Sequence, residues 1–173
     1  MPSTLVMTFI GRDRPGLVNT IASRIAAEGG AWLESKLARL GGEFAGIVRV
    51  ESPSDKVAAL TAALRELEAQ GFRVTIEASQ AVEETKRASM KLELLCLDRP
   101  GIVSEVTAAI SSLGVNIEEF ESGLVEAAFT GQPMFKATLR LQAPQTLVRD
   151  ELSRRLEKLA SEMIADIVLT GED

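Results

Sequence analysis

The tetrapeptide Asp-Arg-Pro-Gly occurs twice, at residues 13–16 and 98–101, and it is the segment of this sequence best suited to binding a small ligand. An apolar run precedes it and a helical pattern follows it, so it is expected to join a strand to a helix. A helix start presents unpaired N–H groups and the positive end of the helix dipole, which favour a carboxylate. Asp13 or Asp98 could cap the helix or contact an ammonium group. A zwitterionic amino acid would find complements to both of its charges here.

Proline and glycine have separate roles in this turn. Pro15 and Pro100 are expected in the first turn of the helix, where a missing N–H costs little. Gly16 and Gly101 lack a Cβ and would let a ligand approach the backbone closely. The same residues are also a sound purely structural way to turn a strand into a helix. Residue chemistry alone leaves both interpretations open.

The amino-acid composition limits the kinds of catalytic and metal site that the chain can form. The 173 residues include no histidine and one cysteine, Cys96, and the net charge of −6 divides into −2 over 1–84 and −4 over 85–173. The absence of histidine excludes Ser-His and Cys-His nucleophile pairs and zinc sites of Cys and His. An enzyme would have to rely on carboxylates and lysines. Neither half has the basic surplus that nucleic-acid binding requires, and no cofactor is indicated.

Two further features bear on the location of the protein and on its cysteine. The sequence shows no signal peptide and no apolar run long enough to span a membrane, so a cytoplasmic protein is expected. Cys96 falls in phase with the alternating apolar residues at 90, 92 and 94, which predicts a small core residue rather than a reactive thiol.

The two tetrapeptides belong to an internal duplication. DRPGLV (13–18) and DRPGIV (98–103) lie 85 residues apart, and the hydrophobic positions on both sides keep that offset. After six added residues in the second copy, FAGIVRV (44–50) matches FKATLRL (135–141). The duplication predicts two domains, residues 1–78 and 90–173, joined by a polar linker over 79–89.

Each copy predicts the element order βαββαβ. Alternation, as in residues 90–94, is typical of a strand with one buried face. The two middle strands are expected to meet at Gly41-Gly42 in copy one and across a longer connection from Glu126 to Pro133 in copy two. Closing strands are expected at 72–76 and 167–169. The helices are predicted by apolar residues at helical spacing: Leu17, Ile21, Ile25; Val57, Leu60, Leu64, Leu67; Ile102, Val106, Ile110, Leu113; and Val148, Leu152, Leu156, Leu159, Met163.

This order defines the fold class. One-sided strands and helices in the order βαββαβ predict an α+β protein made of two ferredoxin-like sandwiches. Each sandwich is expected to be an antiparallel four-stranded sheet with two helices on one face.

The succession of strand, DRPG[LI]V, amphipathic helix, glycine and extended segment resembles the ACT domain, a small-ligand regulatory module, in both copies. The resemblance covers nearly the whole chain outside the linker and the tail. It implies allosteric sensing rather than catalysis. ACT modules pair side by side into a joined sheet and bind amino acids at the interface, using the turn after the first strand and the start of the second.

The resemblance also implies which residues bind the ligand. Many ACT members have asparagine at the start of the second strand, where copy two has Asn116 and copy one has Ala31. Copy two is therefore expected to hold the better site, although Asn116 could instead satisfy a turn. The implied residues are Asp98, Arg99, Pro100, Gly101, Ile102, Val103, Asn116 and Ile117, and in the weaker site Asp13, Arg14, Pro15, Gly16, Leu17, Val18, Ala31 and Trp32.

The implied function is that of a non-enzymatic regulator that senses a small amino acid, glycine or a similar one. Because the sequence has neither a helix-turn-helix signature nor a basic patch, repression of transcription would act through a separate DNA-binding protein. The alternative is a detached regulatory subunit that docks on an enzyme of amino-acid or folate metabolism. Exposed sheet edges also favour a homodimer.

Overall fold

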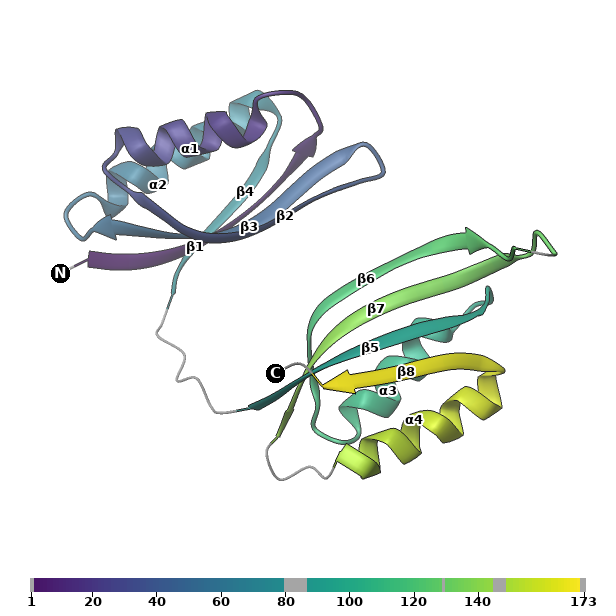
Figure 1. Ribbon diagram of the computed structural model, residues 1–173. Helices are drawn as coiled ribbons and strands as arrows, with labels where there is room; N and C mark the ends of the chain where they lie inside the picture. Colours follow the sequence, from purple (N-terminus) through teal and green to yellow (C-terminus); the bar gives the residue numbers. More distant parts are fainter. Residues whose placement is uncertain (1, 80–86, 129, 145–148, 172–173) are drawn as a thin grey trace. The chain divides into compact units, whose positions relative to one another are not determined.

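The computed structural model describes residues 2–79, 87–128, 130–144 and 149–171. The chain divides into two units, residues 1–83 and 84–173, which are called module 1 and module 2 below (Figure 1). Each module is a four-stranded antiparallel sheet with two helices on one face. The predicted α+β class and the two ferredoxin-like βαββαβ sandwiches are confirmed.

Module 1 has the strand order β2-β3-β1-β4 across its sheet. The first and third strands therefore lie in the centre, and β2 and β4 form the two edges. Its elements are β1 (Pro2–Arg12), α1 (Leu17–Ala27), β2 (Ala31–Leu40), β3 (Glu43–Pro53), α2 (Val57–Arg65), the 3-10 helix η1 (Glu66–Gln70) and β4 (Arg73–Ala78).

Module 2 repeats this topology with the order β6-β7-β5-β8. Its edges are β6 and β8. Its elements are β5 (Arg87–Leu97), α3 (Ile102–Ser111), β6 (Asn116–Glu126), β7 (Pro133–Pro144), α4 (Arg149–Met163) and β8 (Ala165–Gly171).

Both ends of the predicted linker form hydrogen bonds with strands of the modules. Ser79 donates its backbone N–H to Thr4 at 2.8 Å, and β5 already begins at Arg87 because residues 87–89 pair with residues 142–144 of β7. The domain limits 1–78 and 90–173 stay a prediction. Val148, expected to begin the apolar face of the last helix, lies outside the described residues.

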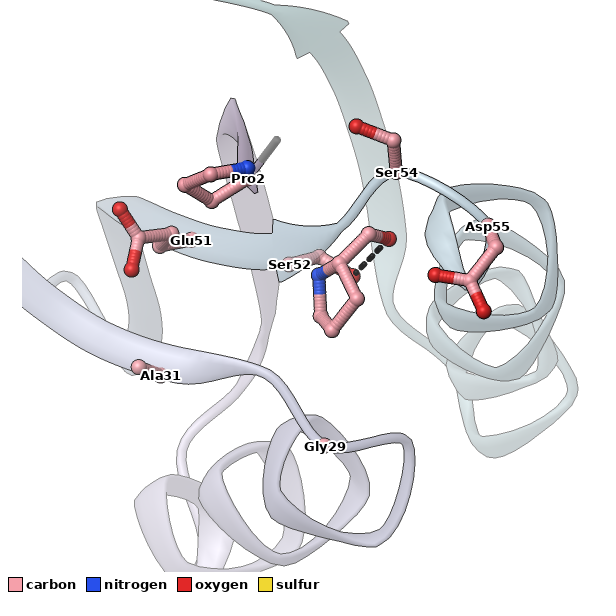
Figure 2. A pocket seen from close by; sticks show the side chains of 8 residues that line it. Pro2, Gly29, Ala31, Glu51, Ser52, Ser54 and Asp55 are labelled. Atoms are coloured by element: carbon pink, nitrogen blue, oxygen red, sulfur yellow. Dashed lines mark hydrogen bonds between the residues drawn. The ribbon is translucent and has the colours of Figure 1, made fainter.

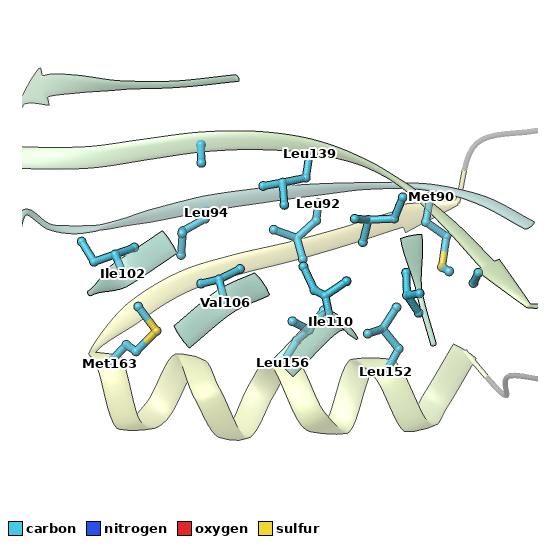
Figure 3. Close-up of a cluster of buried hydrophobic side chains, with 14 of the residues drawn as sticks. Met90, Leu92, Leu94, Ile102, Val106, Ile110, Leu139, Leu152, Leu156 and Met163 are labelled. Carbon is cyan, nitrogen blue, oxygen red and sulfur yellow. The ribbon is translucent and has the colours of Figure 1, made fainter. Parts of the chain in front are cut away.

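Each module has a hydrophobic core of its own, and the two cores share no residue. In module 2 the inward residues Met90, Leu92 and Leu94 of β5 are buried (Figure 3). Cys96, the next inward residue, is buried as well, which confirms the predicted alternation. The helices contribute the apolar positions predicted from their spacing, with Leu113 and Leu159 only partly buried. Packing of one helical face on one sheet face therefore positions every turn discussed below.

Both edge strands next to the third strand carry the same irregularity. The pairing register shifts between Trp32 and Glu34 in β2 and between Ile117 and Glu119 in β6, and these positions are 85 residues apart. A bulge of this kind turns the following side chains and twists an edge strand. Beyond each bulge the glutamate pairs with an arginine of the adjacent strand: Glu34 with Arg49 at 3.0 Å and Glu119 with Arg140 at 3.1 Å.

Candidate functional site

The Asp-Arg-Pro-Gly turns have the same backbone in both modules. Gly16 (φ 87°, ψ 1°) and Gly101 (φ 95°, ψ −11°) are the N-cap residues of α1 and α3, and both adopt the left-handed conformation. A residue with a Cβ is strained there, so the backbone itself requires glycine. Both glycines are exposed, which leaves the start of each helix accessible to a ligand.

One detail of the predicted turn is wrong, and one of the two alternatives for its aspartates is excluded. Pro15 and Pro100 were expected in the first turn of the helix, but the helices begin at Leu17 and Ile102, so each proline lies before the N-cap. The left-handed glycine separates the proline from the helix. Neither helix has a side-chain cap, so the aspartates do not cap their own helices.

In module 1 the side chains of the turn contact other residues of the same module. The carboxylate of Asp13 lies 2.6 Å from the Arg39 guanidinium at the end of β2. The Arg14 guanidinium lies 5.8 Å from the centre of the Phe72 ring and donates to Gln70 at 3.4 Å. Nothing lies within 4 Å of the position that a Cβ on Gly16 would occupy. The start of α1 is therefore open.

In module 2 the arginine folds forward over the helix start. Arg99 donates both terminal nitrogens to Glu105, each at 2.7 Å. This hydrogen bond lowers the pKa of Glu105 and raises that of Arg99. A Glu105 oxygen would lie 3.3 Å from a Cβ on Gly101, so a carboxylate already stands beside this helix start. The matching residue of module 1, Thr20, donates its hydroxyl to the Gly16 carbonyl instead.

The first helical residues present both a buried and an exposed side chain. Leu17 and Ile102 are buried in the cores, so only their backbone could contact a ligand. Val18 and Val103 are 40% and 44% exposed. Of the implied residues in each turn, the aspartate, arginine, proline, glycine and valine are accessible.

The strand starts lie at the opposite end of each module from the turns. Ala31 pairs with Glu51, which pairs with Thr4 near the beginning of β1. Asp13 instead donates its N–H to Gly42, beyond the other end of β2. A strand of ten residues spans about 30 Å. One module therefore does not bring its turn and its strand start together.

The same separation holds in module 2. Asn116 pairs with Gln142, which pairs with Ser89, whereas Asp98 donates its N–H to Pro133 at the far end. Asn116 is exposed, and Ile117 packs against the core. Trp32 packs against its core in the same way and is partly buried.

A pocket of about 580 Å³ adjoins Ala31 in module 1 (Figure 2). Its lining joins hydroxyl and carboxylate groups, which together suit a cation such as an ammonium group. Ser52 is fully buried there and donates its hydroxyl to the Pro53 carbonyl at 3.3 Å. The lining residues are Pro2, Gly29, Ala31, Glu51, Ser52, Pro53, Ser54 and Asp55.

Apart from Ala31, sequence reasoning missed the residues of this lining. The offset of 91 places Gln142 and Ala143 in module 2 where module 1 has Glu51 and Ser52. Module 1 thus has a carboxylate and a hydroxyl where module 2 has an amide and a methyl group. This difference between the copies is the signal that could have identified the pocket.

Other kinds of site receive no support in the described part of the chain. Cys96 is 2% exposed, and burial raises its pKa, so its thiol is a core group. No group of three or more His, Cys, Asp and Glu residues among those described could hold a metal ion. No described helix is long and apolar enough to cross a membrane.

Comparison with known families defines the class of protein. ACT-domain models match residues 3–79 and residues 91–139. The chain therefore belongs to the ACT-domain family and carries two ACT domains in tandem.

The particular relatives are transcriptional repressors. The chain is 24% identical to the glycine cleavage system transcriptional repressor of Escherichia coli (strain K12) over 163 residues, 93% of this chain and 86% of that protein. The Shigella flexneri protein of the same name matches to the same extent.

Solved structures show the same architecture over the whole length. A protein of unknown function from Galdieria sulphuraria matches with a TM-score of 0.89 and 27% identity, covering 100% of both chains. A proposed glycine cleavage system transcriptional repressor matches with a TM-score of 0.74 and 15% identity, covering 100% of this chain and 99% of its own. At that identity the second match shows the fold alone.

Proposed function

We propose that this protein senses a small amino acid, glycine or a similar one, and regulates transcription as a glycine-cleavage-type repressor through a separate DNA-binding protein. The observation that carries the proposal is the extent of the match: ACT-domain models match residues 3–79 and 91–139, and a repressor relative aligns over 93% of the chain. The net charge of −6 supports a protein partner rather than direct contact with DNA. The regulator acts in the cytoplasm.

The turn and the strand start of one module are separate candidate contacts for the ligand. A small amino acid is far shorter than the strand that separates a turn from the strand start of its own module, so one module cannot supply both contacts. The helix start receives the carboxylate. The strand start of module 1 suits an ammonium group, because Glu51 and Asp55 line a pocket together with Ala31 and give it negative charge.

The two turns are not equivalent as carboxylate sites. In module 1 nothing lies within 4 Å of a Cβ placed on Gly16, whereas in module 2 the Glu105 carboxylate, bound by Arg99, already lies beside the helix start. The turn at 13–18 is therefore the more open of the two, although Asn116 belongs to module 2. Both turns stay candidates, and the variants described below separate them.

A thermal-shift and calorimetric screen against the twenty amino acids tests the sensing role. A ligand at a hundred times its Kd stabilises the folded state by about 2.7 kcal/mol, which raises the melting temperature measurably. Glycine or an amino acid of similar size is the expected hit. Binding of no amino acid, with no heat in calorimetry, overturns the proposal.

Matched aspartate variants test the site without straining the turn. Val18→Asp and Val103→Asp each place an anion in the first turn of a helix at an exposed position, where it stabilises the helix by about 0.3–1 kcal/mol. The same anion repels a ligand carboxylate. Each variant is the control for the other, and the one that abolishes binding identifies the turn in use. Unchanged affinity in both variants contradicts a site at the helix starts.

Asn116→Ala tests the strand start of module 2. Loss of a ligand hydrogen bond weakens binding by about tenfold. The substitution removes an exposed side chain, so the melting temperature without ligand stays close to that of the native chain.

Capture of partners from the host identifies what is regulated. The tagged chain is incubated with host lysate with and without the amino acid found in the screen. A DNA-binding transcription factor, retained in one condition and released in the other, supports repression. An enzyme of amino-acid or folate metabolism as the ligand-dependent partner contradicts it and supports the detached-subunit alternative.

A further inference from the structure

A basic hollow on the helical side of module 2 lies apart from the turns and strand starts. It has a volume of about 570 Å³ and is formed where the end of α3 meets α4. Ser112 and Leu113 line it after the last turn of α3. The remaining lining residues belong to α4: Glu151, Arg154, Arg155 and Lys158.

The charged residues of α4 form a single stripe. Glu151, Arg154, Arg155 and Lys158 are spaced by three and four residues, so they lie on one face of the helix. All four are exposed, beside the buried leucines that anchor α4 to the sheet. The lining has a formal charge of +2, in a chain whose net charge is −6.

The duplication supplies an internal comparison. When the buried leucines Leu60 and Leu64 of α2 are aligned with Leu152 and Leu156 of α4, the basic positions have no basic counterparts. The positions that match the lining are Ala27, Glu28, Ala59, Ala62, Ala63 and Glu66, with a formal charge of −2. Glu66 is paired with Arg24 at 2.6 Å. The charge at these positions is therefore positive in module 2 and negative in module 1. Because both modules have the same fold, the fold itself does not require the positive charge.

Contacts within the module leave much of this positive charge available. Arg154 Nε donates to the Asp150 carbonyl at 3.2 Å, and Lys158 Nζ lies 3.8 Å from Glu162. Within the described ranges, no ion pair involves Arg155. The last turn of α3 has no basic residue of its own, so its carbonyl end attracts these cations. A structural role of this kind is the alternative that an experiment must separate from binding.

We propose that this hollow binds the phosphate group of a small ligand, as an effector site distinct from the amino-acid site. Two guanidinium groups can bind phosphate oxygens in bidentate fashion, and an ammonium group adds a point charge. Glu151 is the one carboxylate of the lining and repels an anion, but Arg154, Arg155 and Lys158 outnumber it. The surplus of cations therefore decides the class of ligand.

Titration of inorganic phosphate, and separately of pyrophosphate, into 15N-labelled protein at constant ionic strength tests this site. The amides of Ser112, Leu113 and residues 151–158 should shift along a saturable curve. Arg155→Gln should weaken binding by about tenfold, since it removes a charge-assisted contact. Arg65→Gln, which removes a cation from α2 of module 1, is the matched control and should leave the curve unchanged. Either anion binding in this way supports the site, and the tighter of the two indicates a monophosphate or a diphosphate ligand.

Two results would overturn the proposal. In the first, neither anion gives a saturable shift and Arg155→Gln only lowers the melting temperature. The cations would then stabilise the carbonyl end of α3 instead of binding a ligand. If the shifts are spread over basic residues of both modules and Arg65→Gln weakens them equally, the anions interact with the surface without a specific site. Arg155→Lys keeps the charge and guards against a folding defect, because it should retain part of the phosphate affinity.

Discussion

At the scale of single residues, a substitution at Gly16 measures how much free energy a left-handed N-cap costs a residue that has a Cβ. Its φ is 87°, and nothing lies within 4 Å of a Cβ placed there, so Gly16→Ala adds backbone strain without a clash. We expect the free energy of unfolding to fall by about 1–2 kcal/mol, measured by urea denaturation. Gly16→Asn should recover part of the loss, because asparagine tolerates this conformation better.

The control for this substitution is Gly123→Ala in β6. Gly123 has an ordinary φ and no neighbour within 4 Å of an added Cβ, so alanine there should leave stability unchanged or raise it slightly. Equal losses at both positions would mean that the left-handed backbone is not the cause.

Glu105 gives the second turn a pH dependence. Its hydrogen bond with Arg99 lowers the pKa of the carboxyl below the ordinary value of 4.5. A lowered folded-state pKa contributes stability that is present above the ordinary value and is lost as the pH falls through the folded value. Glu105→Gln should therefore lower the melting temperature slightly at neutral pH, and the difference should vanish in acid. A difference that grows below about pH 4.5 would contradict this pairing.

Burial of individual residues could be predicted from the sequence, but their polar partners could not. The alternation through Leu92 and Leu94 places them in the core whatever the neighbouring strands do. The ion pair of Asp13 with Arg39 joins residues 26 positions apart. It depends on where β2 ends, and no local pattern determines that point.

At the scale of elements, the helices and strands could be predicted because each has a single apolar face. The bulges at Trp32 and Ile117 could not, since one extra residue on an exposed edge leaves the hydrophobic pattern almost unchanged. The site itself could be predicted only as two segments. That they lie at opposite ends of a module follows from the direction of the second strand and is visible only in the fold.

The edge strand β2 carries exposed aliphatic residues that favour pairing with another edge. Leu33 is 45% exposed and Leu40 83% exposed. If β2 pairs with a second copy of the chain, these leucines become covered, and Leu33→Lys with Leu40→Lys should shift the protein toward monomer in analytical ultracentrifugation. Val168→Lys on the edge strand β8, 52% exposed, is the control. A native chain that sediments as a monomer at all concentrations would contradict a homodimer through β2.

At the scale of the whole molecule, duplication has produced two separate hydrophobic cores with different surfaces. The cores keep matching residues, such as Leu64 with Leu156. The polar groups differ at Glu105, at the buried Ser52 and along the charged stripe of α4. Two modules with the same core packing but different polar groups can bind different ligands with one fold.

The separate cores predict that the two modules lose stability independently. Leu64 and Leu156 are 1% and 2% exposed, so replacement of either by alanine should cost about 2–5 kcal/mol. We expect Leu64→Ala to speed amide hydrogen exchange in β1 and β3 only, and Leu156→Ala to speed it in β5 and β7 only. In the double variant the two effects should add within about 0.5 kcal/mol. If Leu64→Ala also speeds exchange in β5 and β7 to the same extent, the two modules unfold as one cooperative unit.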